Sequence, residues 1–534
     1  MKYIIVTGGV ISGLGKGITA SSIGLLLKEM GMKVTAIKID PYLNLDAGTM
    51  SPFEHGEVYV LDDGTETDLD LGNYERFLDI RLTGAHNITT GKIFYSVFED
   101  ERKGKYLGKT VQTIPHVTNK IKDIINETAY IPVDGTEDIP DVCIVELGGT
   151  VGDIESLHFI EAIRQMKFQN TDDTFCFIHV SLVSGLGLST EDKTKPTQNS
   201  VKDLRKLGIS PDLMVIRCPR EIDDKIRDKL SLFCEVPHEN IIINPNVNSI
   251  YDVPIGFHQQ DIEHLIRKKL NIEQSFICHE STFCTGIKKV NSLYKKLFTT
   301  RLRIGIVGKY TGLQDSYLSI IRAIEHAAFS HNQLVDLVWI SSEDLELEKG
   351  DSMDRLRVCQ GIVIPGGFGI RGIEGMIKTA SYCREQDVPL LGICLGMHII
   401  CIEALRKSLG TQNCNSVEFD PATEHPVVFP VEELDTQYMG GTMKLGLKKT
   451  VSQDGDILER HRHRYEINPQ YINDLKKEGL YFPGTSEDGL CMDICCINKL
   501  KFYKGCQYHP EFLSRLDKPG PLFRELVDAI IKED

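Results

Sequence analysis

The 534-residue chain has no run of about 18 uninterrupted apolar residues, the length that a helix needs to cross a bilayer. It is also short of positive charge: 60 Lys and Arg stand against 76 Asp and Glu, for a net charge of −16. Nucleic-acid phosphates require a basic surface, although a few lysines suffice for a nucleotide pocket. We therefore expect neither a membrane nor a nucleic acid among the partners.

The 15 cysteines lack the paired spacing of zinc-binding motifs, and their number is odd. No cleavable leader is evident before the strand-like start at Met1–Val6. We expect mostly buried thiols in a reducing compartment, and therefore a cytoplasmic protein.

Short apolar runs alternate with helical patterns in both halves of the chain, which predicts an α/β fold with mostly parallel, doubly wound sheets. The chain is too long for one hydrophobic core, and the polar, Lys-rich stretch 276–300 separates two series of strands. We expect domains at 1–275 and 301–534 joined by that linker. The expected strands are Ile4–Thr7, Val34–Ile39, Val142–Leu147, Thr174–Val183 and Leu213–Ile216, then Leu302–Val307, Val335–Ile340, Gly361–Ile364 and Leu390–Ile393.

A candidate nucleophile stands at the end of the last of these strands. Cys394 follows Leu390–Ile393, precedes a helical pattern and has Gly392 and Gly396 on its two sides. Such an elbow presents a side chain at the tip of a tight turn, where the helix N-terminus stabilises a thiolate. The alternative is a buried structural cysteine, the commoner fate of this residue.

Two further segments favour the nucleophile. The glycine-rich turn Pro365–Gly369 can offer backbone N–H groups to an oxyanion. In Gln507–Phe512, the spacing of His509 and Glu511 allows a base with a carboxylate that orients it, and Pro510 indicates a strand end or edge. The sequence therefore predicts the triad Cys394, His509 and Glu511.

These motifs resemble the class I glutamine amidotransferases over roughly residues 300–534. The resemblance implies that Cys394 forms a glutamyl thioester and releases ammonia with help from His509 and Glu511. His398 departs from the family, which has glutamine four residues after the nucleophile. The implied glutamine contacts are Gly367, Leu395, Gly396, Met397, His398, Glu418 and Arg464.

A second candidate site begins with the loop Thr7–Gly17, which follows the first strand and opens a helix. Its backbone N–H groups and Lys16 suit phosphate, but Val10 and Gly17 depart from the Walker A pattern, and Gly17 replaces the metal-binding hydroxyl. A generic glycine loop is the alternative.

Carboxylates elsewhere must then hold a cation. Asp68 and Asp70 alternate with apolar residues, so that both can point the same way along a strand, and Glu146 ends a buried run. Two polar clusters, Gly152–Ser156 and Lys193–Gln198, can anchor a base, a sugar or phosphates. Solvated surface charges are the alternative for both the carboxylates and the lysines.

Nearly the whole chain resembles the CTP synthases, a family with an N-terminal P-loop-like amidoligase domain and a C-terminal class I amidotransferase domain. The most specific segments are Val6–Ile18, Lys38–Gly56, Asp62–Arg76, Val145–Ser156 and Lys193–Ser200. The resemblance implies a ligase in which ATP phosphorylates O4 of UTP and ammonia then displaces the phosphate to give CTP.

Residue roles follow from the same resemblance. Asp70 and Glu146 would hold Mg²⁺. ATP contacts would be Gly13, Leu14, Gly15, Lys16, Gly17, Ile18, Lys38, Asp70 and Val247. UTP, and CTP as feedback inhibitor, would contact Ser12, Asp153, Ile154, Glu155, Lys193, Thr194, Lys195, Pro196, Thr197, Gln198 and Lys229.

The family further implies an ammonia tunnel with His55 near its synthase end, activation by GTP with Arg371 as a contact, homotetramers and filaments of tetramers. Two rivals are open at this point. One is an amidating synthetase of the dethiobiotin synthetase type that acts on another acceptor. The other is a filament-forming binding protein with decayed sites, although all the candidate catalytic residues are present.

Overall fold

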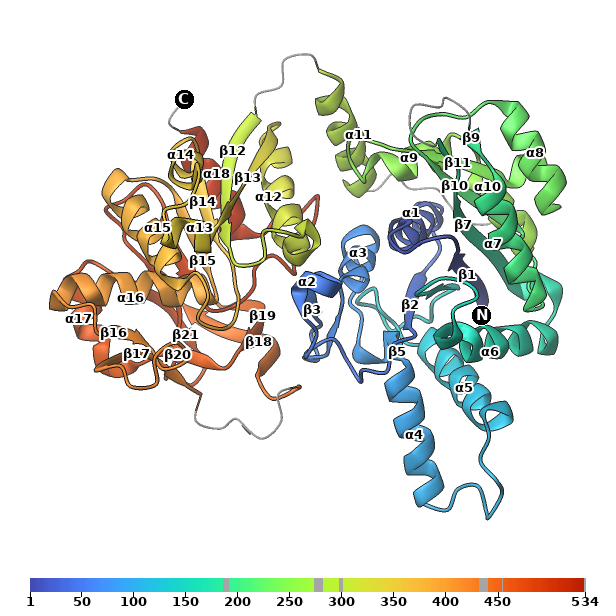
Figure 1. Ribbon diagram of the computed structural model, residues 1–534, viewed down its shortest axis with the longest axis horizontal. Coiled ribbons are helices and arrows are strands. Elements are labelled where there is room, and N and C mark those ends of the chain that lie inside the picture. Colours follow the sequence, from blue (N-terminus) through green and yellow to red (C-terminus); the bar gives the residue numbers. More distant parts are fainter. Residues whose placement is uncertain (186–191, 273–281, 297–300, 432–439, 454, 533–534) are drawn as a thin grey trace. The chain divides into compact units, whose positions relative to one another are not determined.

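The computed structural model describes residues 1–185, 192–272, 282–296, 301–431, 440–453 and 455–532. These residues form two compact units, and each unit has its own central sheet (Figure 1). Unit 1 comprises Met1–Asp46 and Asp70–Asn291, and unit 2 comprises Ala47–Leu69 and Ser292–Asp534. The predicted division at 276–300 is therefore not the only crossing, because the chain also enters unit 2 at Ala47 and leaves it after Leu69.

Unit 1 is built on a seven-stranded sheet in which all strands are parallel. Every residue of β1 after Lys2 is buried, as expected for a strand that helices cover on both faces. The strands, in spatial order, are β11 (Ile241–Pro245), β10 (Leu213–Cys218), β7 (Phe175–Leu182), β1 (Lys2–Gly8), β6 (Val142–Leu147), β2 (Val34–Asp40) and β5 (Asn87–Thr89).

The helices of unit 1 include α1 (Lys16–Glu29), α3 (Leu69–Leu78), α4 (Thr90–Arg102), α5 (Thr118–Ala129), α6 (Leu157–Gln169), α7 (Lys195–Lys206), α8 (Asp224–Cys234), α9 (Asp252–His258) and α10 (Ile262–Leu270). Helix α11 (Thr282–Lys295) lies within the predicted linker and contains the crossing from unit 1 to unit 2. The remainder of the predicted linker, 276–281 and 297–300, lies outside the described residues.

Unit 2 contains a nine-stranded sheet that is parallel in one half and antiparallel in the other. The parallel half is β13 (Leu334–Ser341), β12 (Arg301–Gly308), β14 (Gly361–Ile364), β15 (Leu390–Ile393) and β23 (Tyr503–Cys506). The sheet continues antiparallel through β22 (Met492–Cys496), β21 (Tyr481–Ser486), β18 (Lys444–Ser452) and β19 (Ile457–His463).

A small second sheet in unit 2 contains β16 (Cys414–Ser416), β17 (His425–Pro430) and β20 (Tyr465–Ile467). The helices of the unit include α12 (Leu318–Ser330), α13 (Ser342–Glu346), α14 (Ser352–Arg357), α15 (Ile373–Gln386), α16 (Leu395–Leu409), α17 (Ile472–Lys477) and α18 (Pro521–Ile531). The segment from Ala47 to Leu69 adds α2 (Pro52–His55) and the hairpin of β3 (Val58–Val60) and β4 (Glu66–Asp68).

The predicted α/β class and all nine predicted strands are confirmed to within two residues at each end. One local prediction is wrong. Asp68 and Asp70 do not share the face of a strand, because β4 ends at Asp68 and Asp70 lies in the first turn of helix α3. The two carboxylates moreover belong to different units.

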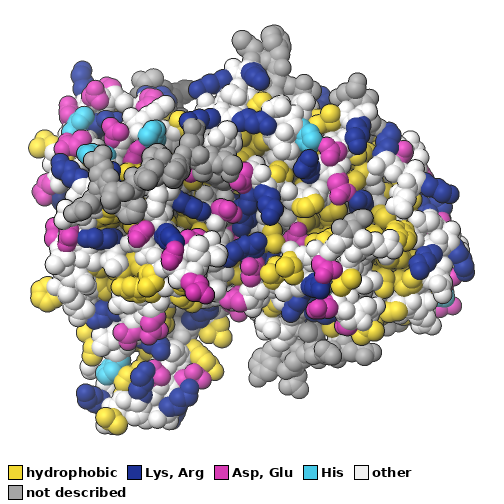
Figure 2. All heavy atoms as spheres, turned by 180° about the vertical axis from the view of Figure 1, so that it is seen from behind, with side chains coloured by type: hydrophobic (Ala, Val, Ile, Leu, Met, Phe, Trp, Pro, Cys, Tyr) yellow, Lys and Arg dark blue, Asp and Glu magenta, His cyan; other side chains and the backbone are white. Residues whose placement is uncertain are grey.

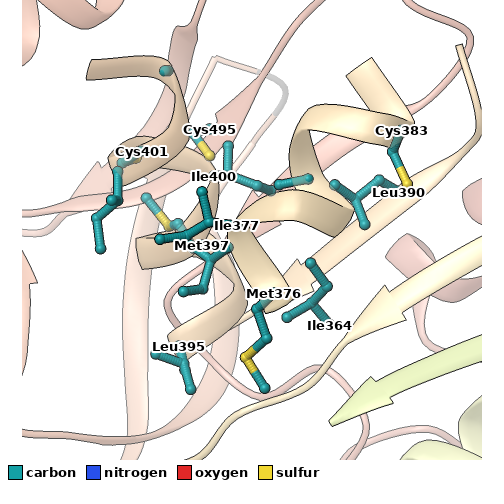
Figure 3. Packing of buried hydrophobic residues seen from close by; sticks show 14 of the residues in the cluster. Ile364, Met376, Ile377, Cys383, Leu390, Leu395, Met397, Ile400, Cys401 and Cys495 are labelled. Atoms are coloured by element: carbon teal, nitrogen blue, oxygen red, sulfur yellow. The ribbon is translucent and has the colours of Figure 1, made fainter. Parts of the chain in front are cut away.

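A tightly packed core fixes the helix that follows Cys394. Figure 3 shows Met376 and Ile377 of α15 beside Met397 and Ile400 of α16. The side chains of α16 from Leu395 to Arg406 are all buried. Because α16 is held on every side, the turn at its N-terminus has a fixed position in unit 2.

Segment 47–69 is attached to unit 2 by buried polar contacts. The Glu57 carboxylate accepts hydrogen bonds from the Ser319 N–H, at 2.7 Å, and from the Ser319 hydroxyl at the start of α12. The fully buried guanidinium of Arg460 donates to Asp62 Oδ1 at 2.6 Å and to the Val60 carbonyl at 2.9 Å. Arg462 donates to buried Glu66 at 2.8 Å. Since burying a charge is costly without a partner, these contacts bind the segment to the C-terminal residues.

Acidic and basic side chains alternate over the face in Figure 2, with no basic band. Among the described residues, no helix combines the length and the apolar character that crossing a bilayer demands.

The ion pair of Arg460 and Asp62 predicts a stability effect. Asp62→Asn should destabilise unit 2 by about 1–3 kcal/mol, since it weakens a hydrogen-bonded partner of a buried charge. The single tryptophan of the chain, Trp339, lies in β13, so its fluorescence during urea unfolding reports on unit 2. Asp63→Asn, at the exposed neighbouring position, is the matched control. Equal unfolding midpoints for the two variants would contradict the anchoring.

Candidate active sites

The backbone at Cys394 adopts a conformation that non-glycine residues rarely adopt, with φ 52° and ψ −101°. Cys394 stands directly after β15 and caps α16, and its N–H donates to the Cys506 carbonyl at 2.7 Å. Neither flanking position has room for a side chain, so both must be glycine. A Cβ on Gly392 would lie 2.6 Å from the Gly396 carbonyl, and a Cβ on Gly396 would lie 2.2 Å from the Ile364 carbonyl oxygen. The elbow predicted from the sequence is therefore present.

The predicted triad residues line one cavity of about 700 Å³ within unit 2. His509 Nδ1 lies 2.7 Å from Glu511 Oε1, and its backbone N–H donates to the Arg460 carbonyl at 2.8 Å. The Phe512 ring stacks on the imidazole at 5.2 Å. Burial lowers the pKa of His509, but the Glu511 carboxylate and Cys394 outweigh burial and raise it to about 10. The site therefore favours an imidazolium beside the sulfur.

The glycine turn after β14 lies next to the thiol. A Cβ on Gly366 would lie 3.0 Å from His509 Cε1 and 3.6 Å from Cys394 Cβ. The turn is held from both sides, because Gly369 N–H donates to Glu418 Oε1 at 2.7 Å and Lys309 Nζ donates to the Phe368 carbonyl at 3.2 Å and to the Gly369 carbonyl. Burial lowers the pKa of Lys309 to about 8. The turn is thus fixed in a position beside the reacting sulfur.

The predicted glutamine contacts divide into two groups. Gly367, Glu418 and Arg464 line the cavity with Cys394, and Arg464 donates to the Thr442 hydroxyl at 3.0 Å. Leu395, Gly396, Met397 and His398 are buried in the first turn of α16 and are not among the lining residues. Arg371, the predicted GTP contact, lines the cavity and lies over the Phe53 ring, whereas His55, at the end of α2, does not line it.

In unit 1, the loop between β1 and α1 supplies the predicted phosphate site. Val10, Gly13 and Gly15 have positive φ, and α1 begins at Lys16 directly after the loop. Lys16 Nζ donates to the Gly149 carbonyl at 2.8 Å, and burial lowers its pKa. Strands β7, β1, β6 and β2 are parallel neighbours, so the segments after them meet at one edge of the sheet.

Two carboxylates converge on the start of α1. A Cβ on Gly17 would lie 2.1 Å from Asp70 Oδ1 and 3.6 Å from Glu146 Oε2. The carboxylate of Asp70 thus occupies the space of the Walker hydroxyl, which explains the glycine at position 17. Lys38 Nζ bonds Asp70 and lies 3.3 Å from Glu146 Oε1, and Tyr74 donates its hydroxyl hydrogen to Glu146. Burial and the charge of Asp70 raise the pKa of Glu146.

This donor set fits Mg²⁺, which binds proteins through one or two carboxylates together with substrate phosphates. Within the described residues, no group of three or more His, Cys, Asp or Glu side chains could hold a metal. Two oxygen ligands beside a phosphate loop therefore suit a cation that arrives with a nucleotide.

The other predicted nucleotide contacts lie along the same edge or beyond it. Ser12 lies in the phosphate loop with Gly13, Leu14 and Gly15, and Ile18 lies in the first turn of α1. Asp153, Ile154 and Glu155 follow β6. Lys193 ends the short strand β9 (Asp192–Lys193), Thr194 is the N-cap of α7, and Lys195, Pro196, Thr197 and Gln198 form its first turn. Lys229 is on α8, and Val247 follows β11 at the sheet margin.

Several residues at these sites escaped the sequence reasoning. Asp40, Tyr74 and His179 of unit 1 and Lys309 and Gln507 of unit 2 are buried polar side chains that contact predicted residues or the loops carrying them. Asp40 directly follows a predicted strand and Gln507 stands two residues before His509, which are usable signals. Tyr74 and His179 lie in helical or apolar patterns that show no sign of the site.

The fold and the elbow geometry define unit 2 as a class I glutamine amidotransferase domain, joined in one chain to a parallel α/β unit. Two family models match: "CTP synthase N-terminus" over residues 2–272 and "Glutamine amidotransferase class-I" over residues 312–529. The chain belongs to the CTP synthase family, whose members are glutamine-hydrolysing ligases.

Individual relatives agree over the full length. CTP synthase of Dictyostelium discoideum is 47% identical over 100% of this chain and 99% of its own. CTP synthase 1 of Homo sapiens is 48% identical over 99% of this chain and 93% of its own. A solved structure described as the Trypanosoma brucei CTPS glutaminase domain with bound acivicin is 31% identical, covering 44% of this chain and 95% of that one, with a TM-score of 0.40.

The pairing of His509 with Glu511 predicts the effect of removing the carboxylate. Glu511→Gln should lower the pKa of His509, because burial lowers this pKa and the carboxylate that raises it most is then gone. The variant should reduce glutamine hydrolysis at least about tenfold. The measurement is the rate of glutamate release against pH. Glu525→Gln, at a partly exposed pair with Lys504, is the control. Wild-type hydrolysis by Glu511→Gln would exclude the carboxylate from the site's chemistry.

The close approach at Gly17 predicts that restoring the Walker residue is harmful. Gly17→Ser should reduce ammonium-dependent CTP formation at least about tenfold, since its Cβ must displace Asp70. Glutamine hydrolysis in unit 2 should persist. Gly256→Ser, at a glycine with no atom within 4 Å of its Cβ position, is the control. Normal or increased CTP formation by Gly17→Ser would overturn this explanation of the glycine.

Proposed function

We infer that the chain aminates UTP to CTP in two linked reactions, with ammonia made in unit 2 and consumed in unit 1. The observation that carries this proposal is the presence, in one chain of this family, of a strained thiol beside a His–Glu pair and of a phosphate loop beside paired carboxylates and lysines. The first site suits amide hydrolysis and the second suits phosphoryl transfer.

In the first reaction, Cys394 attacks the side-chain carboxamide of glutamine. His509 protonates the leaving nitrogen, which departs as ammonia and leaves a glutamyl thioester on the sulfur. Water then adds to the thioester with its proton going to His509, and glutamate leaves. The backbone of the turn at Gly366–Gly369 faces the developing oxyanion, while Arg464 holds the α-carboxylate of glutamine and Glu418 holds its α-ammonium group.

In the second reaction, O4 of the UTP uracil attacks the γ-phosphorus of ATP, and ADP leaves. Ammonia next adds to C4 of the phosphorylated base, and phosphate departs with the O4 oxygen. Lys16 and Lys38 hold and neutralise the transferred group. Mg²⁺, held by Asp70 and Glu146, would supply further charge neutralisation at the phosphates.

The finer assignments belong to the same proposal. ATP contacts are Gly13–Ile18, Lys38, Asp70 and Val247, and UTP contacts are Ser12, Asp153–Glu155, Lys193–Gln198 and Lys229. CTP inhibits at an overlapping site, GTP activates at Arg371, and ammonia passes through an internal tunnel with His55 near its end. Along the sequence the domains are 1–275 and 301–534 with a linker at 276–300, with residues 47–69 of the first folded into unit 2, and the enzyme is cytoplasmic and forms homotetramers and filaments.

Comparing two nitrogen sources tests the proposal. Cys394→Ala should abolish CTP synthesis from glutamine while synthesis from ammonium salts stays near the wild-type rate, because only the thioester step is lost. Lys16→Ala should stop CTP formation from both sources, because phosphorylation precedes amination. The assay follows CTP formation from UTP and ATP with either donor, and Cys401→Ala, at a buried cysteine about two turns further along α16, is the control. Loss of both activities in Cys394→Ala would refute the two-site scheme.

A further inference from the structure

His398 occupies the position, four residues after Cys394, at which the family has glutamine, and it does not reach the cavity. Its side chain is 3% exposed, and its Nε2 lies 2.8 Å from Oε1 of Gln507. Gln507 is 1% exposed and stands between β23 and His509, where its backbone N–H donates to the Asp493 carbonyl at 2.9 Å. The substitution therefore connects two buried polar side chains behind the cavity wall.

The other end of the Gln507 carboxamide reaches the sulfur. Gln507 Nε2 lies 3.8 Å from Cys394 Sγ, within the range of an N–H···S hydrogen bond. The thiol itself can donate to the Arg462 carbonyl at 3.6 Å, and this contact is lost when the sulfur is deprotonated. A carboxamide has donors on one side and an acceptor on the other, so whichever atom faces His398 decides which faces the sulfur.

We propose that His398 is a positioning residue for the nucleophile: its ring N–H holds Oε1 of Gln507 and thereby directs the amide N–H toward Cys394 Sγ, where it stabilises the thiolate. This inference rests on the proposed role of Cys394 as the nucleophile. It gives position 398 in this chain a task other than binding the substrate. An N–H that points at the sulfur stabilises negative charge, whereas a carbonyl oxygen in its place would repel it.

The imidazole of His398 is neutral, so the position of its single N–H sets the orientation of the Gln507 carboxamide. Burial lowers the pKa of His398 to about 4, so the ring is neutral near pH 7 and carries one N–H. With that hydrogen on Nε2, the ring donates to Gln507. The opposite tautomer would direct Nδ1–H to the Tyr465 carbonyl and turn the carboxamide round, with oxygen toward the sulfur. That carbonyl already lies 3.2 Å from Nδ1 of His463.

The two orientations of the Gln507 carboxamide have opposite effects on the thiolate of Cys394: an N–H toward the sulfur stabilises it, and an oxygen toward the sulfur destabilises it. The inference can therefore be tested. The titratable side chains around the thiol include His398, His461 and His463 behind the cavity wall, and Arg371, Glu418, Arg462, Arg464, His509 and Glu511 along the cavity. A variant at position 398 keeps the other side chains but removes one contribution to the lowered pKa of His463, so a second variant at Gln507 is needed to assign a change in thiol reactivity to the carboxamide.

The experiment measures alkylation of Cys394 by iodoacetamide in the full chain between about pH 5 and pH 10, the range in which thiolates form. The modified peptide is quantified by mass spectrometry. His398→Leu should move the pH midpoint of alkylation up by about one unit, the effect of losing one hydrogen bond to a charged group. His398→Gln, whose amide can also donate to Oε1, should keep the wild-type midpoint. The kcat of glutamine hydrolysis near pH 7 should fall about tenfold in His398→Leu with KM unchanged, following the lost thiolate.

Gln507→Glu provides a second route, because it replaces the amide donor with a negatively charged carboxylate oxygen of nearly the same shape, and it should raise the midpoint further. Cys401→Ala, which removes a buried side chain from the same helix, should leave the midpoint unchanged. An unchanged or lowered midpoint in both His398→Leu and Gln507→Glu would overturn the proposal, as would a raised KM with constant kcat in His398→Leu. Failure of glutamine to protect Cys394 from alkylation in the wild type would instead refute the nucleophile itself, and with it this inference.

Discussion

The conformation of one residue, Cys394, sets the requirements for much of unit 2. A cysteine with φ 52° and ψ −101° is stable only where its surroundings leave no alternative. Strand β23 fixes it from one side, because the Cys394 N–H donates a hydrogen bond to the Cys506 carbonyl, and the packed helix α16 fixes it from the other. The glycines at 392 and 396 are the consequence, since any side chain there would overlap the neighbouring backbone. The strain aims the sulfur at the cavity, the glycine turn and His509.

In unit 1, several carboxylates lie close together around one lysine near the start of α1. Asp70, Glu146 and Asp40 are gathered around Lys38, and Glu146 and Asp40 are buried there, so that burial and the neighbouring carboxylates raise the pKa of both. The Lys38 ammonium balances part of this charge. In the proposed function, a nucleotide with its cation would alter the same balance of charge.

The sequence was sufficient for the features that depend on neighbours along the chain. Buried parallel strands appear as continuous apolar runs, which is why β6, β14 and β15 were placed to the residue. The elbow, the glycine turn and the His509–Glu511 pair are each local, and the structure brings them to one cavity. The Asp68–Asp70 prediction failed because a period of two within five residues cannot distinguish the end of a strand from the first turn of a helix.

Features that depend on distant contacts were beyond such reasoning. Nothing in the letters around Arg460 indicates that its guanidinium is fully buried against Asp62, nearly four hundred residues earlier. Gln507 resembles any polar residue at a strand end until the fold places it between His398 and the sulfur. In each case the partner is chosen by the tertiary structure, and propensity and spacing carry no trace of it.

The return of residues 47–69 to the C-terminal unit has a consequence for how this protein can change over generations. A recombination event at the linker would exchange the strand that carries Arg460 and Arg462 but leave behind the hairpin that carries Asp62 and Glu66. In the chimera, a buried guanidinium would face side chains from a different protein in place of its carboxylate partner. The heritable module is therefore discontinuous, and its two pieces can be exchanged only together, however far apart they lie in the gene.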